Sequence, residues 1–268
     1  MTMIGKFFTR LERLISFNWF NPFATIYLNM RTMPLSKALR MPVWVYGRPR
    51  LMELSGKIVI EGKMKSGMIR FNYVNFGPSN MGVQSEIALG GTIIFKGKAN
   101  IRTGNRIGVG HDGVLELGRN VIIADYINIG CYNHIKIGDN VRLSHRSQLF
   151  DSNYHYVVNL NKGIIPPVVK SIEIGSHCWI CNTCSIYPGT VLPAYTIVSK
   201  NSMVNKSFAD MPQGSIIGGI PAKLISSGFK LVNNTVKESE ITNHYNKTGD
   251  LYVIDSDLDE ADWFEYNR

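Results

Sequence analysis

Aliphatic residues recur at every sixth position in the second half of the chain. In the clearest block they are Ile174, Ile180, Ile186, Leu192, Val198 and Val204. A small residue stands four positions after each of the first five: Cys178, Cys184, Thr190, Thr196 and Ser202. Because six and four are even numbers, both sets point to the same side of an extended chain, whereas a helix of 3.6 residues per turn cannot keep this period. The pattern predicts short strands joined by tight corners, stacked as coils around an aliphatic column.

The same period runs through two earlier blocks. One contains Leu117, Ile123 and Ile129, shifts by two positions, and resumes at Ile137, Leu143 and Leu149. A weaker block precedes it, with Val83, Leu89, Phe95, Ile101 and Ile107. Glycine often follows the aliphatic residue, as at Gly138 and Gly175, which suits a corner that needs positive φ or leaves no room for a Cβ. The predicted fold class is an all-β solenoid, a parallel β-helix over residues 83–225.

The period is interrupted between Leu149 and Ile174, where twenty-five positions replace six. An inserted loop over residues 150–173 is therefore expected, and long loops in compact domains are more often functional than not. Residues 1–82 are expected to form an N-terminal, partly helical cap and the first irregular coils, with helical stretches around 6–17 and 35–40. Residues 226–268 are expected to form a C-terminal extension with a short helix and an acidic tail.

The net charge of +9 is unevenly distributed along the 268 residues. Residues 251–268 contain six acidic residues against Arg268, a net of −5, so the preceding 250 residues carry +14. Such a basic body suits an anionic ligand, a membrane surface or nucleic acid. No alternation of aromatic and basic residues and no nucleic-acid motif stands out, so no nucleic-acid partner is expected. The acidic tail is typical of a solvated or disordered end.

Four cysteines in this length do not suggest a disulfide framework, and a reducing compartment is expected. Lys6, Arg10 and Glu12 interrupt the apolar segment that a signal peptide would need, which predicts a cytoplasmic protein. Cys178, Cys181 and Cys184 have a spacing that suggests a metal site at first sight. The repeat instead places Cys178 and Cys184 at inward positions, where cysteine acts as a small buried residue, so no metal is expected.

The segment "CWICNTCSIYPGTVLPAYTIVSKNSMVNKSFADMPQGSIIGGIPAKLI" joins this repeat to a preceding histidine-bearing loop, a Trp-Ile pair, a Val-Asn-Lys segment and a Pro-Ala-Lys ending. The combination resembles the hexapeptide-repeat acyltransferases, and among them bacterial sugar O-acetyltransferases of cell-surface polysaccharide synthesis. The resemblance implies a left-handed parallel β-helix, acetyl-CoA as co-substrate, and a homotrimer with active sites between subunits. Lys200-Asn201 departs from the Ala-Gly pair that is typical beside the cofactor.

Acyl transfer to a hydroxyl needs a base that removes the hydroxyl proton, and histidine titrates in the suitable range. His155, in "FDSNYHY", occupies the position at which the resemblance implies a catalytic histidine. Asp151 or Asn153 in the same loop is a candidate to orient its ring. Asn133, in the preceding coil, is a candidate donor to the oxyanion of the tetrahedral intermediate.

Cations are expected to bind the phosphates of CoA. Lys206 in "VNKSF" and Lys223 in "IPAKLI" match basic positions that the resemblance places near the nucleotide, and Lys200 adds a third cation. Trp179 is a candidate to flank the pantetheine arm or the adenine. The predicted function is an acetyl-CoA-dependent O-acetyltransferase acting on a hydroxyl of a sugar or surface-polysaccharide precursor, with His155 as general base and direct transfer without a metal.

Two alternative functions stay open, and so does the role of the N-terminus. Some relatives with this fold are zinc-dependent carbonic anhydrases, and His134, His145 and His155 are the histidines that such a hydratase would use. A non-catalytic scaffold would use the basic body for binding alone. The aromatic and basic N-terminus, with Trp19 and Phe20 following Arg13, suggests a cap of the solenoid and also suits contact with another subunit or peripheral contact with a membrane.

Overall fold

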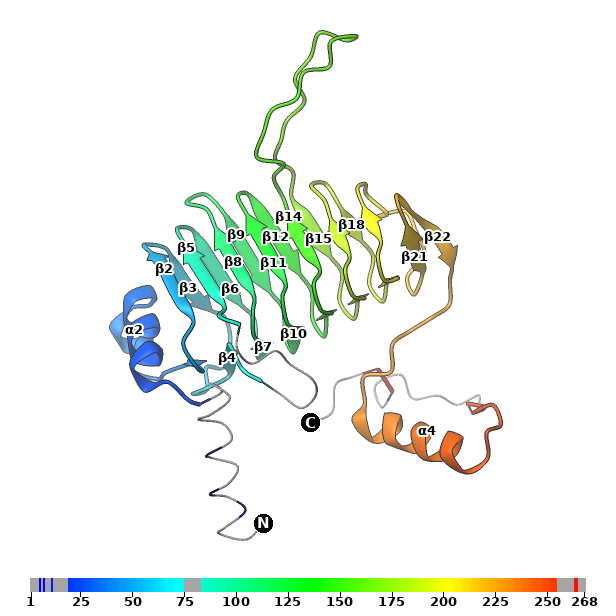
Figure 1. The fold of residues 1–268 in the computed structure, drawn as a ribbon, viewed down its shortest axis with the longest axis horizontal. Helices are drawn as coiled ribbons and strands as arrows, with labels where there is room; N and C mark the ends of the chain where they lie inside the picture. Colours follow the sequence, from blue (N-terminus) through cyan, green and yellow to red (C-terminus); the bar gives the residue numbers. More distant parts are fainter. Residues whose placement is uncertain are drawn as a thin grey trace.

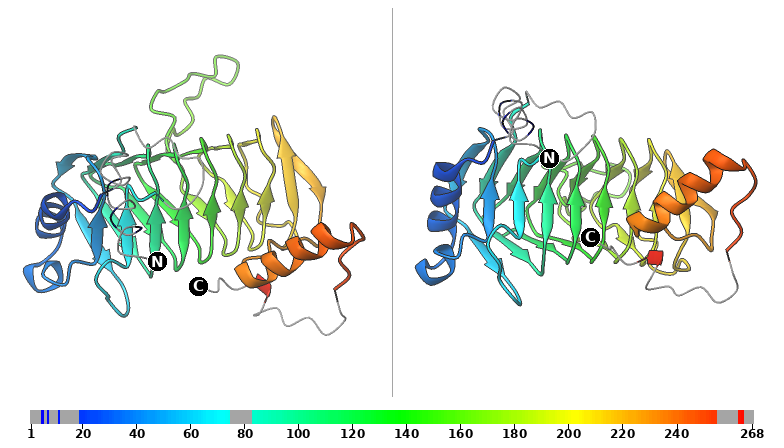
Figure 2. Two further views of the ribbon diagram at one scale, coloured as in Figure 1. Left: turned by 60° about the horizontal axis from the view of Figure 1, so that its bottom comes forward. Right: turned by 90° about the horizontal axis from the view of Figure 1, so that it is seen from below.

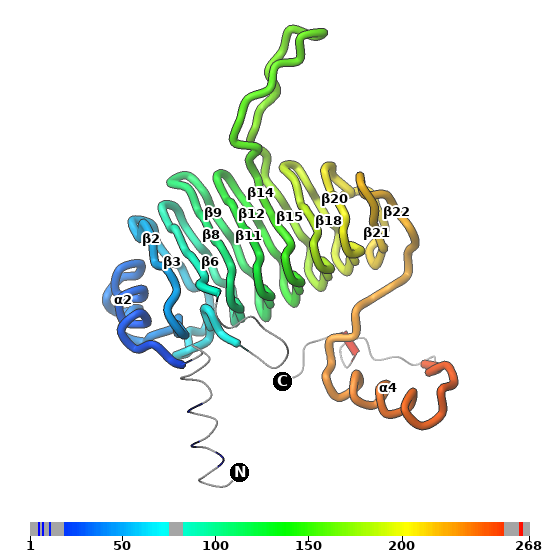
Figure 3. Tube along the Cα trace, viewed as in Figure 1, coloured from blue at the N-terminus to red at the C-terminus, as the bar shows by residue number. Residues whose placement is uncertain are grey.

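The computed structural model describes residues 19–74, 83–254 and 263–264, and also Gly5, Phe7 and Leu11. Within this part of the chain, short strands form sheets of nine, seven and six strands, which we call the first, second and third sheet (Figure 1). From β1 to β20, consecutive strands enter the three sheets in turn, so three strands and three corners make one coil. The tube in Figure 3 follows these coils along the axis. The predicted fold class, an all-β solenoid of the left-handed parallel β-helix type, is confirmed.

The described strands and helices have the following bounds. The first sheet contains β1 (Val43–Val45), β4 (Ile69–Phe71), β7 (Ala99–Ile101), β10 (Val121–Ile123), β13 (Arg142–Leu143), β16 (Trp179–Ile180), β19 (Ile197–Val198), β21 (Ile216–Gly219) and β22 (Ala222–Ser226). The second sheet contains β2 (Arg50–Leu54), β5 (Glu86–Leu89), β8 (Arg106–Val109), β11 (Asn128–Cys131), β14 (Gln148–Phe150), β17 (Ser185–Ile186) and β20 (Met203–Val204). The third sheet contains β3 (Lys57–Ile60), β6 (Thr92–Phe95), β9 (Val114–Leu117), β12 (His134–Ile137), β15 (Ile172–Ile174) and β18 (Val191–Leu192). The helices are α2 (Pro22–Thr32), α3 (Leu35–Ala38) and α4 (Thr235–Lys247).

The aliphatic period is the interior of the solenoid. Parallel pairing places Ile129 beside Ile107 on one side and beside Leu149 on the other, so each aliphatic residue stacks on its equivalent in the next coil. The six members of the clearest block and the five small residues that follow them are all at most 2% exposed. Val83 is exposed and does not join the column. The interpretation of the period as an inward column is therefore confirmed from Leu89 onward.

Glycines at the corners make room for close stacking. A Cβ on Gly138 would lie 2.6 Å from the backbone nitrogen of Ser176, and one on Gly175 would lie 2.5 Å from that of Ala194. Neither glycine has positive φ. Of the two reasons expected for these glycines, the lack of space is the one that applies. Positive φ falls instead on residues such as Asn140 and Asn201, a residue type that tolerates it.

Helix α2 closes the N-terminal end of the solenoid (Figure 2). Asn21 caps it and Pro22 stands in its first turn, two start signals that the sequence analysis did not use. The Asn29 side-chain amide donates to Val43 O at 2.7 Å, and its oxygen accepts from Val43 N at 3.2 Å. The Thr25 hydroxyl accepts from Val45 N at 3.0 Å. The helix thus satisfies backbone groups at the free edge of β1.

The other N-terminal expectations are met in part. Helix α3 falls inside the stretch 35–40 that was expected to be helical. The stretch 6–17 lies outside the described residues, except for Phe7 and Leu11, which are helical. The coils already begin at β1, within residues 1–82, and the domain boundaries stay a prediction.

The first sheet ends with the antiparallel pair β21–β22, and the C-terminal extension that follows contains α4, the short helix that was expected. Asn233 joins it to the solenoid, since its oxygen accepts from Arg142 Nε at 2.8 Å and its backbone nitrogen donates to Trp263 O at 3.1 Å. The acidic residues Asp255, Asp257, Asp259, Glu260, Asp262 and Glu265 lie outside the described residues. Among the described helices, none has the length and apolar character needed to cross a membrane.

The Asn29→Ala substitution should destabilise the fold. It leaves the buried N–H and C=O of Val43 without their partner, which costs about 2–4 kcal/mol in the free energy of unfolding. Met30→Ala, an exposed position on the same helix, should change that free energy by less than about 0.5 kcal/mol. Urea unfolding followed by circular dichroism measures both. Equal effects of the two substitutions would mean that Asn29 does not hold the edge of β1.

Candidate functional site

The inserted loop leaves the solenoid at the corner between the second and third sheets, after β14, and returns at β15. It projects away from the coils as a long hairpin (Figure 1). Antiparallel bridges join Ser152 to Val169 at its base and Asn159 to Ile164 near its tip. Large apolar side chains along it are exposed: Tyr156, Val157, Val158, Leu160, Ile164 and Ile165. The apolar side chains of the loop are therefore largely exposed to solvent in a single chain.

Asp151 holds the base of this loop on the preceding coil. Its carboxylate is buried and accepts from the backbone N–H of Tyr132 at 2.7 Å and from that of Asn133 at 2.8 Å. Its carbonyl accepts from Lys170 N at 2.9 Å, on the returning strand of the loop. The carboxylate is thus directed toward the preceding coil rather than toward the His155 ring, which it was predicted to orient.

His155 lies at the exposed base of the loop. Its backbone N–H donates to Asn153 O at 2.6 Å, and its imidazole has no hydrogen bond or ion pair with another described residue. It follows Tyr154, whose φ of 60° is unusual for a residue other than glycine. Such backbone conformations are frequent at functional sites. The role of His155 as general base stays a prediction.

Asn133, the candidate oxyanion donor, lies at the same corner. Its side-chain amide donates to Ser171 Oγ at 3.0 Å, and this bond joins the preceding coil to the returning end of the loop. The side chain is exposed on this side of the solenoid. The structure therefore brings Asn133, Asp151 and His155 to one corner, although it shows no direct contact between Asn133 and His155.

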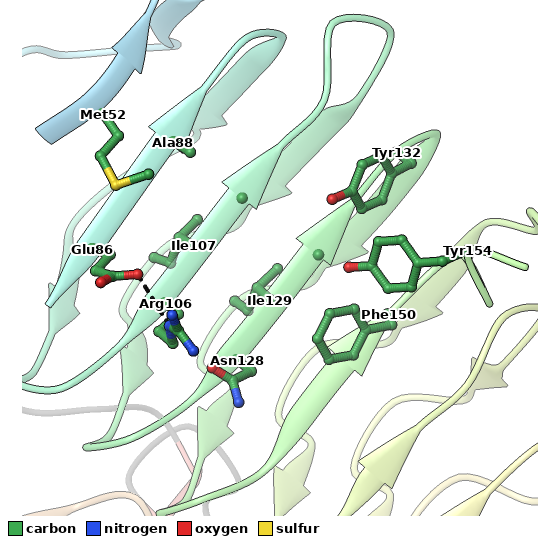
Figure 4. A pocket seen from close by; sticks show the side chains of 12 residues that line it. Met52, Glu86, Ala88, Arg106, Ile107, Asn128, Ile129, Tyr132, Phe150 and Tyr154 are labelled. Carbon is green, nitrogen blue, oxygen red and sulfur yellow. Dashed lines mark hydrogen bonds and ion pairs between the residues drawn. The ribbon is translucent and has the colours of Figure 1, made fainter. Parts of the chain in front are cut away.

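A pocket of about 280 Å³ opens on the outer face of the second sheet beside this corner (Figure 4). Its floor is made of small residues, because Ala88, Gly108 and Gly130 pair in register across β5, β8 and β11. Figure 4 shows polar side chains at one end and aromatic rings at the other. The residues of these two walls are Glu86, Arg106, Asn128, Tyr132, Phe150 and Tyr154.

The aromatic wall joins the pocket to the loop. The Tyr154 ring meets the Tyr132 ring edge-on, with 5.1 Å between centroids, and the Phe150 ring at 5.8 Å. The Tyr154 hydroxyl lies over Gly130, where a Cβ would be 2.7 Å from it. Burial, and then the contact with the Tyr132 side chain, raise the pKa of Tyr154 well above its usual value. The hydroxyl therefore stays protonated and can donate a hydrogen bond.

The polar wall carries charges of both signs. Glu86 accepts from Arg106 Nε at 3.1 Å and from Arg50 Nη1 at 2.8 Å. The hydrogen bond from Arg106 is the largest cause that lowers the pKa of Glu86, so this carboxylate is ionised at neutral pH. The sequence analysis missed this pocket. The sequence does contain one sign of the pocket, the small residues Ala88, Gly108 and Gly130, each of which lies between two buried apolar residues. They form the floor of the pocket only once the coils are stacked in register.

The predicted CoA-binding residues are distributed over two parts of the solenoid. Lys206 follows β20 and lies on the same corner edge as the loop, two strands beyond β14, or about 10 Å at the usual strand spacing. Lys200 lies at the corner that follows β19, and Lys223 lies on β22 opposite Gly218. Trp179 lies on the first sheet, where its indole N–H donates to Ser144 Oγ at 2.9 Å. One chain therefore brings Lys206 to the loop's edge, and leaves Lys200, Lys223 and Trp179 on and beside the first sheet.

The histidines of the zinc alternative lie on different parts of the chain. His134 Nε2 is 2.8 Å from Glu116 Oε1 on the third sheet, and His145 Nδ1 is 3.4 Å from Asp125 Oδ2 at a corner before the second sheet. His155 is in the loop. Among the residues that the structure describes, no group of three or more histidine, cysteine, aspartate or glutamate side chains could hold a metal ion.

The cysteines occupy separate positions in the repeat. Cys178 and Cys184 are fully buried, and their thiols donate to Pro193 O and Ser199 O, each at 3.1 Å. Cys181 lies between them at a corner and is partly buried. Burial raises the pKa of Cys178 to about 12 and that of Cys181 to about 11. The interpretation of Cys178 and Cys184 as small inward residues is confirmed.

The described residues define a parallel β-helix with a histidine-bearing loop at one corner and a pocket at the base of that loop. No family model matches the chain. A curated protein of Escherichia coli (strain K12), named as a putative lipopolysaccharide biosynthesis O-acetyl transferase, WbbJ, is 27% identical over 143 residues, which cover 50% of this chain and 71% of that protein. The crystal structure of NeuO, a polySia-specific acetyltransferase, has a TM-score of 0.52 and 14% identity, and the match covers 80% of this chain and 91% of that one. The likeness to NeuO shows the fold, and together the two matches confirm the resemblance inferred from the motifs.

The native thiols should react slowly with a disulfide reagent such as dithionitrobenzoate. At about pH 8 a raised pKa leaves less than about 1% of a Cys178 thiol ionised, and the thiolate is the reactive form. We expect the four cysteines to react at least about tenfold more slowly in the native protein than in urea. Release of stoichiometric zinc when a mercurial reagent titrates the thiols would contradict the assignment of Cys178 and Cys184 as buried free thiols.

Proposed function

We propose that the chain is an acetyl-CoA-dependent O-acetyltransferase that modifies a hydroxyl of a sugar or a surface-polysaccharide precursor. The observation that carries this proposal is the position of His155, on a projecting loop at one corner of the solenoid and next to Tyr154 of the adjoining pocket. The name of the WbbJ relative supports the acetyl group and the saccharide acceptor. The fold shared with NeuO is consistent with both.

In the proposed reaction, His155 accepts the proton of the acceptor hydroxyl as that oxygen attacks the carbonyl carbon of the acetyl thioester. A new C–O ester bond forms, the C–S bond breaks, and the sulfur of CoA leaves with the proton that the imidazolium returns. Asn133 is the proposed donor to the oxygen that becomes negative, and its amide would have to turn away from Ser171. Asp151 acts through the loop, because it fixes the base from which His155 projects.

The pocket on the second sheet is the proposed acceptor site. Sugar rings present apolar C–H faces and many hydroxyl groups, and this pocket offers an aromatic wall opposite Arg106, Asn128 and Glu86. Its small-residue floor lets a ring approach the sheet closely. The pocket and His155 are joined through Tyr154, which belongs to the aromatic wall and precedes His155 in the chain.

The proposed assembly is a homotrimer with active sites between subunits. Two observations support a shared site. The loop exposes a row of apolar side chains in the single chain, and Lys200, Lys223 and Trp179 lie away from the loop's edge. A neighbouring subunit can cover the loop and supply these residues as the cations and the aromatic ring for CoA.

The proposed catalytic domain comprises residues 83–225, and the proposed location of the protein is the cytoplasm.

The His155→Ala variant should lose acetyl transfer by about 10²–10⁴-fold in kcat, because general base catalysis contributes an effect of this size. His244→Ala, on helix α4 of the C-terminal extension, is the matched control and should keep its activity. Thiol release from acetyl-CoA with a panel of sugars and nucleotide sugars measures both. Full activity of His155→Ala would contradict the mechanism. Absence of thiol release, together with zinc-dependent hydration of carbon dioxide that a chelator abolishes, would favour the hydratase alternative.

The Gly108→Val variant should weaken acceptor binding without damage to the fold. A Cβ at Gly108 has only ordinary contacts, 3.9 Å from Ile129 O, so the valine side chain would fill the pocket floor. We expect the KM for the acceptor to rise by about tenfold or more, with the KM for acetyl-CoA and the melting temperature nearly unchanged. Thr92→Val, on the third sheet, is the control. An unchanged acceptor KM would place the acceptor elsewhere.

A further inference from the structure

Helix α2 exposes a stripe of large apolar side chains on its outer side. Phe23 is 82% exposed, Ile26 47%, Tyr27 54% and Met30 41%. Their spacing of three, one and three positions places them on one face of the helix. Leu35 and Leu39, in and just after α3, continue the surface with 63% and 62% exposure. We call these six residues the cap face.

The buried face of α2 is more polar than that of an ordinary amphipathic helix, since Leu28 is the one apolar residue among its four buried residues. Its inward residues include Thr25 and Asn29, whose side chains bond the backbone of β1, and Thr32, which is buried as well. The end of a solenoid normally presents a polar outer face to water. The polar side chains on the inner side of α2 are explained by the free edge of β1, whose backbone groups they bond. Capping this edge does not explain why the outer side of the helix is apolar.

The surroundings of the cap face are basic. Residues 19–49 contain Arg31, Lys37, Arg40 and Arg48 and no acidic residue. Between α3 and the turn after β3 there is a hollow of about 460 Å³. Lys37, Arg40 and Lys63 line it, and none of its lining residues is acidic. The hollow is of a size and charge that suit a phosphate headgroup.

We propose that the cap face docks on an anionic lipid bilayer, with the apolar stripe entering the interface and the cations beside it meeting lipid phosphates. Apolar and aromatic side chains flanked by lysine and arginine are the features that bind helices in the plane of a membrane. Negative lipid headgroups attract each nearby lysine or arginine. A second copy of the chain fits less well, because a two-fold contact through this face would bring Arg31, Lys37 and Arg40 against the same residues of the partner.

Co-sedimentation of the full chain with vesicles tests the proposal. We expect binding to vesicles of phosphatidylglycerol mixed with phosphatidylcholine, weaker binding to phosphatidylcholine alone, and a decrease as salt is raised. The Phe23→Ser/Tyr27→Ser double variant and the Lys37→Glu/Arg40→Glu double variant should each weaken binding about tenfold or more. Acetyl transfer to a soluble acceptor should be unchanged in both, because these residues lie outside the proposed active site.

Matched changes at the other end of the chain serve as controls. Leu251→Ser/Val253→Ser removes apolar side chains that are at least as exposed as Phe23 and Tyr27, and Lys247→Glu reverses a charge on α4. Both should bind vesicles as the unaltered chain does, and thermal unfolding verifies that every variant is folded. Three results would overturn the proposal: no binding to anionic vesicles, equal binding by the cap-face and control variants, or a change in oligomeric mass with Phe23→Ser/Tyr27→Ser without any vesicle binding.

Discussion

Parallel strands must stack at the distance that their backbone hydrogen bonds require, about 4.8 Å, and this spacing constrains nearly every other feature of the chain. Side chains inside the coil have to fill the same slot in each layer, so aliphatic residues recur at every sixth position. The residues four positions later are buried as well, small from Cys178 to Ser202 but aliphatic at Val121, Ile127 and Val141. Side chains at the corners must not collide with the next layer, which excludes a Cβ at Gly138 and Gly175. Cys178 and Cys184 follow from the same constraint. They fill slots that threonine and serine fill in later coils.

A solenoid with this spacing can carry inserted loops only at its corners and extra helices only at its two ends. The loop that carries His155 leaves at a corner, where it does not break the ladder between β14 and β17. Asp151 attaches that loop by accepting hydrogen bonds from the backbone of the preceding coil, so the preceding coil positions the base of the loop. At the N-terminal end, the side chains of Asn29 and Thr25 in α2 accept hydrogen bonds from the β1 backbone that a further strand would otherwise accept.

The outer faces of the sheets are less constrained, and there the chain departs from regularity. On the second sheet, Ala88, Gly108 and Gly130 leave a hollow that Tyr132, Phe150 and Tyr154 close at one end. On the third sheet, Lys96 forms an ion pair with Glu116, and the other carboxylate oxygen of Glu116 is hydrogen-bonded to His134 Nε2. Histidine at position 134 is thus paired along the sheet. The same solenoid thus has a pocket on one side and a row of mutually bonded charged and polar side chains on another.

The six-residue period by itself determined the solenoid, the inward column, the place of the inserted loop and the register of the cysteines, because strand alternation converts a sequence period directly into a side of the chain. It did not reveal α2, because three of the four buried residues of this helix are polar and most of its large apolar residues are exposed, so that the hydrophobic pattern alone misleads. Nor did it reveal the pocket, whose wall is assembled from Glu86, Arg106 and Tyr154, on different coils. Only the tertiary structure decided that Asp151 faces the backbone of Tyr132 and Asn133 instead of the His155 ring, since residues close in sequence point to different neighbours once the coils are stacked.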